Sequence, residues 1–151
     1  NSNGDNEEPL QLEEPPEVNS PPETDLPMVL LVEDDSDVRR IVRRKLAGIG
    51  YPLVEAESSA EALTLLDRIH EIGILLSDIG IPGGMDGNAL ASRVKVKFPK
   101  IGIVLMSGQT NFSCAEDQRI PFLRKPFDVE DLAQALKSVS SKDMKVRREQ
   151  L

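Results

Sequence analysis

The chain has 151 residues, and 26 acidic residues against 18 basic ones give it a formal net charge of −8. An acidic chain lacks the basic face that nucleic-acid binding requires, so we expect no nucleic-acid partner. Its apolar runs are too short to span a bilayer, so we expect no membrane contact by this segment. The single cysteine, Cys114, cannot form an internal disulfide, which favours a reducing, cytoplasmic location.

Residues 1–27 carry much of the acidity. They contain eight acidic residues, neither Lys nor Arg, and six of the eleven prolines. Because so few of them are apolar, they cannot bury enough surface to offset the entropy of ordering. We expect an acidic, proline-rich linker, with a specific docking segment as the alternative. The chain begins Asn1-Ser2-Asn3 rather than with Met, which indicates a piece of a longer protein.

From residue 28 the apolar pattern alternates between strands and helices. A buried strand over 28–32 leads into a helix that Asp35 or Ser36 caps and that stops at Gly50. A short strand over 53–56 precedes a helix that runs to residue 69. Ser58 and Glu61 have the spacing of a capping box at the start of that helix.

The second half continues the alternation. A third apolar strand over 74–78 ends on Asp78 and is followed by a glycine-rich loop over 79–87. A helix over 89–98, a strand over 101–106, a brief edge strand over 122–124 and a final helix capped by Asp128 follow. Residues 109–118 have weak helical periodicity, so we expect at most a short helix there. From residue 140 the charged chain either extends the last helix or frays.

This alternation predicts the fold class, a doubly wound, three-layer α/β domain with a parallel sheet. We expect one folded domain over residues 28–140, followed by a charged C-terminal tail over 141–151. Right-handed crossovers bring the carboxyl ends of all strands to one edge, where open α/β sheets bind their ligands. The polar residues that end the strands there are Glu33, Asp34, Asp78, Ser107 and Lys125.

These residue types point to phosphoryl transfer. Three carboxylates, from Glu33, Asp34 and Asp78, would repel one another by about 4 kcal/mol per close pair at an effective dielectric constant of 20. A hard divalent cation offsets that repulsion, and a few carboxylates with waters suit Mg²⁺ better than zinc or calcium. The Lys125 ammonium and the Ser107 hydroxyl can neutralise phosphoryl oxygens. The set predicts in-line transfer of a phosphoryl group to Asp78.

Residues 28–140 resemble the response-regulator receiver domain of two-component signalling. The resemblance implies a five-stranded, flavodoxin-like parallel sheet of strand order 2-1-3-4-5. It implies Mg²⁺ as the cofactor and a histidine kinase or histidine phosphotransfer domain as the partner, and it leaves a homodimer open. The matching segments are 29–35 (VLLVEDD), 76–82 (LSDIGIP), 85–87 (MDG), 104–108 (VLMSG) and 123–127 (LRKPF).

The resemblance also implies roles for individual residues. By motif position, Asp78 is the phosphoacceptor, and Glu33 and Asp34 are the pair of acids that bind Mg²⁺. The backbone carbonyl of Gly80 is a further metal ligand, and Lys125 is the lysine that completes the site. Such a domain catalyses its own phosphorylation and dephosphorylation, and it is not an enzyme on external substrates.

The resemblance implies a conformational switch as well. Ser107 supplies the switch hydroxyl, and Phe122 occupies the position of the switch aromatic, with a plain core role as the alternative. Two features depart from the common family pattern. The loop over 82–85 is one residue longer and is similar to receivers fused to sensor histidine kinases, and residues 109–118 fall where the family has its fourth helix.

Two other functions remain as alternatives. The first is a Mg²⁺-dependent aspartyl phosphatase, but those enzymes carry a second Asp two residues after the nucleophile, where this chain has Gly80. The second is a pseudo-receiver that only binds proteins. The complete set of two acids, Asp78, Ser107 and Lys125 argues against it.

Overall fold

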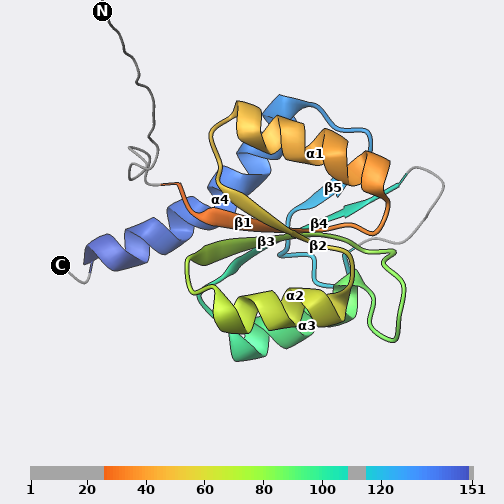
Figure 1. The fold of residues 1–151 in the computed structure, drawn as a ribbon. Coiled ribbons are helices and arrows are strands. Elements are labelled where there is room, and N and C mark those ends of the chain that lie inside the picture. Colours follow the sequence, from red (N-terminus) through yellow and green to blue (C-terminus); the bar gives the residue numbers. More distant parts are fainter. Residues whose placement is uncertain (1–25, 109–114, 150–151) are drawn as a thin grey trace, which may run out of the picture.

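The structure is a computed structural model that describes residues 26–108 and 115–149, and the side chains up to residue 140. Within those residues five strands form one parallel sheet of order β2-β1-β3-β4-β5, which confirms the predicted fold class (Figure 1). The elements in chain order are β1 (Met28–Val32), α1 (Ser36–Gly48), β2 (Leu53–Ala56), α2 (Ser59–Arg68), β3 (Ile72–Asp78), α3 (Gly87–Lys97), β4 (Gly102–Ser107), β5 (Phe122–Arg124) and α4 (Val129–Glu149).

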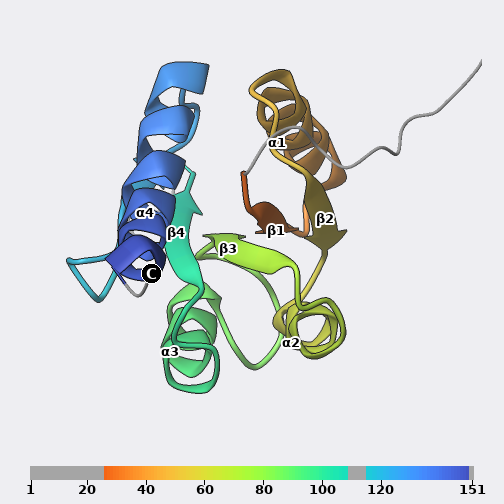
Figure 2. The same cartoon turned by 90° about the vertical axis from the view of Figure 1, so that its left-hand side faces the viewer.

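The sheet is the middle of three layers. Helices α1 and α4 cover one face, and α2 and α3 cover the other (Figure 2). Successive strand residues point to opposite faces, so Leu30 of β1 joins the core under α2 and α3 while Leu31 joins the core under α1 and α4. Strands β1, β3 and β4 are therefore buried on both sides, as their continuous apolar runs predict.

Helix α1 begins where the acidic loop after β1 ends. The Asp35 carboxylate accepts hydrogen bonds from the backbone N–H groups of Asp37 (2.9 Å) and Val38 (3.2 Å), so Asp35 rather than Ser36 is the N-cap. The helix ends at Gly48, and Gly50 follows with a φ of 92°, which favours glycine.

Two predicted boundaries shift toward the N-terminus. Helix α3 begins at Gly87 instead of 89, because Asp86 caps it and accepts from the Ala89 N–H at 2.9 Å. Strand β3 begins at Ile72 instead of 74, since Met28 of β1 already pairs with Ile72.

The predicted capping box of α2 forms only in part. Ser58 accepts from the Glu61 N–H at 3.1 Å, as the spacing predicts. The Glu61 carboxylate accepts instead from the N–H of Glu57 at 2.9 Å, one residue before the cap.

Helix α4 starts as predicted and continues beyond the last residue of its apolar face, Val139. Asp128 accepts from the Asp131 N–H at 2.8 Å at its start. The helix continues to Glu149, so residues 141–149 extend it past the amino-terminal edge of the sheet (Figure 1). No helix in the described part of the chain has both the length and the hydropathy of a membrane span.

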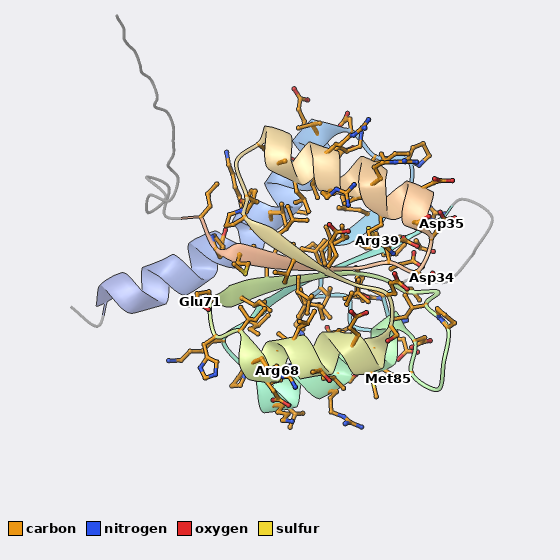
Figure 3. All side chains as sticks on the ribbon, in the orientation of Figure 1. Asp34, Asp35, Arg39, Arg68, Glu71 and Met85 are labelled. Atoms are coloured by element: carbon orange, nitrogen blue, oxygen red, sulfur yellow. The ribbon has the colours of Figure 1, made fainter. Side chains whose placement is uncertain are left out.

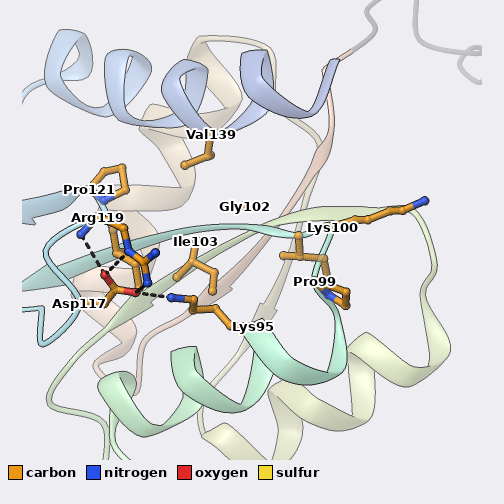
Figure 4. Close-up of a pocket in the computed structure, with 11 residues that line it drawn as sticks. Lys95, Pro99, Lys100, Gly102, Ile103, Asp117, Arg119, Pro121 and Val139 are labelled. Carbon is orange, nitrogen blue, oxygen red and sulfur yellow. Dashed lines mark hydrogen bonds and ion pairs between the residues drawn. The ribbon is translucent and has the colours of Figure 1, made fainter. Parts of the chain in front are cut away.

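The connection between β4 and β5 differs from the other crossovers. Its described part, residues 115–121, consists of bends and turns without a helix, and residues 109–114 of the predicted weak segment lie outside the described residues. Beside it lies a groove of about 440 Å³ with Ile101, Ile103 and Val139 in its wall (Figure 4). At its rim Asp117 pairs with both Lys95 and Arg119.

Candidate functional site

Backbone hydrogen bonds fix the carboxyl ends of three strands relative to one another. The N–H of Ile79, just after β3, donates to the Met106 carbonyl of β4 at 2.8 Å. The N–H of Lys125, just after β5, donates to the Ser107 carbonyl at 2.8 Å. The strand register therefore places Asp78, Ser107 and Lys125 at one edge of the sheet.

Three carboxylates meet at this edge, which is the carboxyl edge of the sheet where the sequence predicts them. Glu33 and Asp34 follow β1, and Asp78 ends β3, the strand hydrogen-bonded to β1. One oxygen of each carboxylate lies within 4.8 Å of the others. Glu33 is 2% exposed and Asp78 is 7% exposed, whereas Asp34 is on the surface. Figure 3 shows Asp34 at this end of the sheet, with Glu71 at the opposite end.

Lys125 bridges the two buried carboxylates. Its Nζ lies 2.8 Å from Glu33 Oε1 and 2.9 Å from Asp78 Oδ1. Burial raises the pKa of the Glu33 carboxyl above its ordinary value, and the hydrogen bond from Lys125 opposes that rise only in part. Burial alone would lower the pKa of Lys125, but the hydrogen bonds to Glu33 and Asp78 and the negative charges of these two carboxylates together raise it. Lys125 is therefore a cation at neutral pH.

The second oxygen of each buried carboxylate binds a backbone N–H. Glu33 Oε2 accepts from Asp35 at 3.1 Å, and Asp78 Oδ2 accepts from Gly80 at 3.1 Å. All four oxygens are thus held in place. Each carboxylate oxygen has two lone pairs, so a further ligand can still be accepted.

The residues present fit a hard divalent cation. Three carboxylates face one ammonium, so the cluster carries an excess of two negative charges when all the acids are ionised. Among the described residues no hydrogen bond or ion pair engages the Asp34 carboxylate. Oxygen ligands of this number and charge are those that Mg²⁺ prefers, with waters completing its shell.

Gly87 contributes to the site through its lack of a side chain. A Cβ at this position would lie 2.4 Å from the Asp78 carbonyl oxygen and 2.6 Å from the Ile79 Cα. The Gly87 N–H also donates to the Ile79 carbonyl at 2.8 Å. Sequence reasoning assigned no role to Gly87. Its place directly after the cap Asp86, within one loop of Asp78, is the signal that could have indicated this close approach.

Ser107 differs from the other residues of the edge. Its side chain is fully buried, and its hydroxyl finds no hydrogen-bond partner in the described part of the chain. Leaving a buried hydroxyl unpaired costs about 1–3 kcal/mol. Such a group is suited to accept or donate a new hydrogen bond when a ligand arrives nearby.

Phe122 lies away from the carboxylates. It pairs with Leu105, two residues before Ser107, and its half-buried ring packs against the core under α2 and α3. The Arg124 guanidinium lies 6.0 Å from the centre of that ring. Phe122 therefore lies on β5, next to the strand that ends at Ser107, and its ring packs partly against the core.

The parallel topology and the acidic edge define a doubly wound α/β protein with a polar ligand site at the carboxyl ends of its strands. The family model of the response regulator receiver domain matches residues 29–137. The chain therefore belongs to the receiver-domain family, whose members are the phosphoryl-accepting modules of two-component response regulators.

Individual relatives are consistent with this assignment. The chain is 34% identical over 108 residues to the DNA-binding transcriptional regulator NtrC of Escherichia coli, covering 69% of this chain and 23% of that protein. It is 35% identical over 119 residues to the sensor kinase CckA of Brucella abortus, covering 76% of this chain and 12% of the kinase. The chain thus spans a quarter or less of these relatives.

Solved structures show the same fold. The signal receiver domain of an HD domain-containing protein from Pseudomonas fluorescens superimposes with a TM-score of 0.70 at 25% identity, covering 80% of this chain and 98% of that one. NtrX from Brucella abortus gives a TM-score of 0.70 at 27% identity, covering 82% of this chain and 28% of that one.

Proposed function

We propose that this chain takes a phosphoryl group from a phosphohistidine onto Asp78, with Mg²⁺ bound by Glu33, Asp34, Asp78 and the Gly80 carbonyl. The observation that carries the proposal is the contact of Lys125 Nζ with both Asp78 Oδ1 and Glu33 Oε1, beside the exposed Asp34. This contact supports the proposal because a nucleophile, a cation and metal ligands would all be needed within one small site.

The reaction exchanges one bond to phosphorus for another. A carboxylate oxygen of Asp78 attacks the phosphorus, its new P–O bond forms as the P–N bond breaks, and the released imidazole takes a proton from solvent. Bound Mg²⁺ would supply charge neutralisation for the phosphoryl oxygens. The Lys125 ammonium already contacts the Asp78 carboxylate, so after transfer it can bind an oxygen of the phosphoryl group on Asp78 instead.

Ser107 completes the proposal as the residue that responds to phosphorylation. Its buried hydroxyl lacks a partner, and a phosphoryl oxygen on the neighbouring strand end would supply an acceptor. Movement of Ser107 toward that oxygen would change the packing above Phe122 on the adjacent strand. We infer that Phe122 couples the site to the surface through packing alone, because it has no hydroxyl.

This chain has an apolar surface next to the site on which a phosphoryl donor could dock. A groove of about 310 Å³ between α1 and the β5–α4 connection is lined by Val38, Ile41 and Phe127, and Lys125 forms part of its wall. Ile41 is 54% exposed there. We infer that a helix of a histidine kinase or a phosphotransfer domain packs on this groove and presents its phosphohistidine to Asp78.

Phosphorylation by a small donor tests the proposal directly. We expect the wild-type chain to gain one phosphoryl group in intact-protein mass spectrometry after incubation with Mg²⁺ and acetyl phosphate. Asp78→Asn should gain none, and a chelator should prevent the gain in the wild type. Asp37→Asn is the matched control, because Asp37 is an exposed acid whose ion-pair partner among the described residues is Arg40. An unmodified wild type, or an equally modified Asp78→Asn, would contradict the proposal.

The same experiment separates the alternatives. An aspartyl phosphatase would turn over an aryl phosphate, and a pseudo-receiver would neither bind Mg²⁺ nor gain mass. Gly80 offers no side chain for acid–base catalysis, and its N–H holds Asp78. We therefore favour a receiver that acts on no external substrate.

For the chain as a whole, we propose that residues 28–140 form the receiver, with 1–27 as a linker and 141–151 as a charged tail. The longer loop over 82–85 supports an origin in a hybrid sensor kinase of the cytoplasm.

A further inference from the structure

Arg39 is a partly buried cation next to the acidic loop, although it belongs to a basic stretch of α1 whose spacing favours a solvated face. Its side chain is 15% exposed, and that of its neighbour Arg40 is 51% exposed. Figure 3 shows Arg39 beside Asp34 and Asp35 at the carboxyl edge of the sheet. Arg39 contacts none of the three carboxylates directly in the described structure.

The guanidinium of Arg39 joins three separate segments. Its Nη1 donates to the backbone carbonyl of Glu33 at 2.8 Å. Its Nε donates to Glu55 of β2 at 3.1 Å, and its Nη2 donates to Glu57 of the β2–α2 connection at 3.4 Å. Arg43, one turn further along α1, also binds Glu55, so the anchor for Arg39 is itself held.

These contacts fix the backbone that carries Glu33 and Asp34. The Glu33 N–H donates to the Ala56 carbonyl of β2 at 3.1 Å, and its carbonyl accepts from Arg39. Both backbone polar groups of Glu33 are therefore tied to the β2 side of the sheet. A lysine would not reproduce this, because its donors all sit on one nitrogen, whereas Arg39 uses three separate nitrogens to reach acceptors on three residues.

We propose that Arg39 is a positioning residue that sets the Mg²⁺ affinity of the site by holding the Glu33–Asp34 backbone. The inference rests on the proposed function, since it concerns the same metal. The direction in which the Mg²⁺ affinity changes when Arg39 is removed distinguishes a positioning role from an electrostatic one. Removing a cation near carboxylates should strengthen Mg²⁺ binding by Coulomb's law, whereas loosening the ligand backbone should weaken it.

Calorimetric titration of the full chain with Mg²⁺ measures this direction. We expect Arg39→Ala to raise the Mg²⁺ Kd about tenfold, the range found when outer partners of metal ligands are removed. Arg39→Lys keeps the charge and should weaken binding nearly as much. Arg40→Ala is the matched control, because within the described part of the chain Arg40 pairs with exposed Asp37 at 2.7 Å, and its removal should leave the Kd equal or lower.

A second measurement needs no metal. The Asp35 N–H donates to the Glu33 carboxylate, so its hydrogen exchange in a chelating buffer reports whether the loop is held. Exchange should be faster in Arg39→Ala and Arg39→Lys and unchanged in Arg40→Ala, with thermal unfolding confirming that each variant is folded. Glu55→Gln, which weakens the anchor, should act in the same direction with a smaller effect.

The outcomes decide between the two proposals. Wild-type Kd and wild-type exchange in both Arg39 variants would overturn the positioning role, as would equal shifts in Arg39→Ala and Arg40→Ala. A wild-type chain that binds no Mg²⁺ would overturn the proposed function instead. The exchange experiment would still test whether Arg39 holds the loop.

Discussion

Two of the ion clusters in the described part of the chain have opposite compositions and different environments. In the first, the Lys125 ammonium lies between the buried carboxylates of Glu33 and Asp78. In the second, the Asp117 carboxylate lies between Lys95 and Arg119 at the rim of a groove (Figure 4). Water screens the second cluster, so its ion pairs contribute little to stability.

Burial gives the first cluster a different role. Two carboxylates that share one cation out of water leave a negative charge that the described protein residues do not neutralise, and the proposed Mg²⁺ would neutralise it. The ion pairs of the exposed cluster hold residues 115–121, the described part of the β4–β5 connection, which has no helix. Similar ion pairs thus leave an uncompensated negative charge at the buried cluster and hold a loop in place at the exposed one.

The largest effect should follow removal of the shared cation. Lys125→Ala leaves Glu33 and Asp78 buried without a counter-charge, so the free energy of unfolding should fall by about 3 kcal/mol in a chelating buffer. Added Mg²⁺ should restore part of the loss. Urea denaturation measures both, with Lys95→Ala of the exposed cluster as the control. Equal losses in the two variants would remove the distinction between the clusters.

A smaller loss should follow from displacing the backbone of the buried cluster. Gly87→Ala drives a methyl group into the Asp78 carbonyl and should cost about 1–3 kcal/mol of stability, with slower phosphorylation by acetyl phosphate. Gly84→Ala, in the same loop, meets nothing within 4 Å and should stay within about 0.5 kcal/mol of the wild type. A Gly87→Ala variant as stable and as active as Gly84→Ala would show that the loop can yield.

The pH dependence of stability should reveal the raised pKa of Glu33. Its folded pKa lies above the ordinary value of 4.5, so the protonated form stabilises the fold. That contribution is complete below pH 4.5 and is lost as the pH rises through the folded pKa. The stability of the wild type relative to Glu33→Gln should therefore decline above pH 4.5 in metal-free urea denaturation. A difference that stays constant or grows with pH would contradict burial as the dominant cause.

The smallest effect belongs to the exposed cluster. Hydrogen bonds from Arg119 and Lys95 hold the pKa of Asp117 well below its ordinary value of 3.8. Its contribution to stability is complete above pH 3.8 and is lost as the pH falls through the folded pKa. Asp117→Asn should therefore cause a small loss at pH 7 that molar salt removes, measured by thermal unfolding. A loss that survives high salt would indicate a packing role.

Sequence reasoning predicts the strand-and-helix order because the apolar runs of β1, β3 and β4 are continuous and are bounded by turn residues. It also places Asp78 and Lys125 at one edge, since parallel crossovers leave no other arrangement. The caps at Asp35 and Asp128 follow from local chemistry. Asp86 escaped notice because the glycine-rich loop before it masks the start of α3.

Other features depend on contacts between distant segments, which no local pattern specifies. The close approach of Gly87 to Asp78 requires the path of a loop in three dimensions. The contact of Arg39 with Glu55 depends on how α1 packs beside β2. Helical periodicity alone predicts that Arg39 and Arg40 both lie on the surface. The partial capping box at Glu61 likewise reflects the geometry of the entering chain.

The bond between Lys125 and Glu33 spans 92 positions of the chain and is made by the residue that directly follows the last strand. During synthesis on a ribosome, both buried acids emerge long before their cation. Under the proposed function, Asp78 would become competent to accept phosphate only after β5 has joined the sheet and has brought Lys125 to the site. Phosphorylation would then report that the fold has formed through β5.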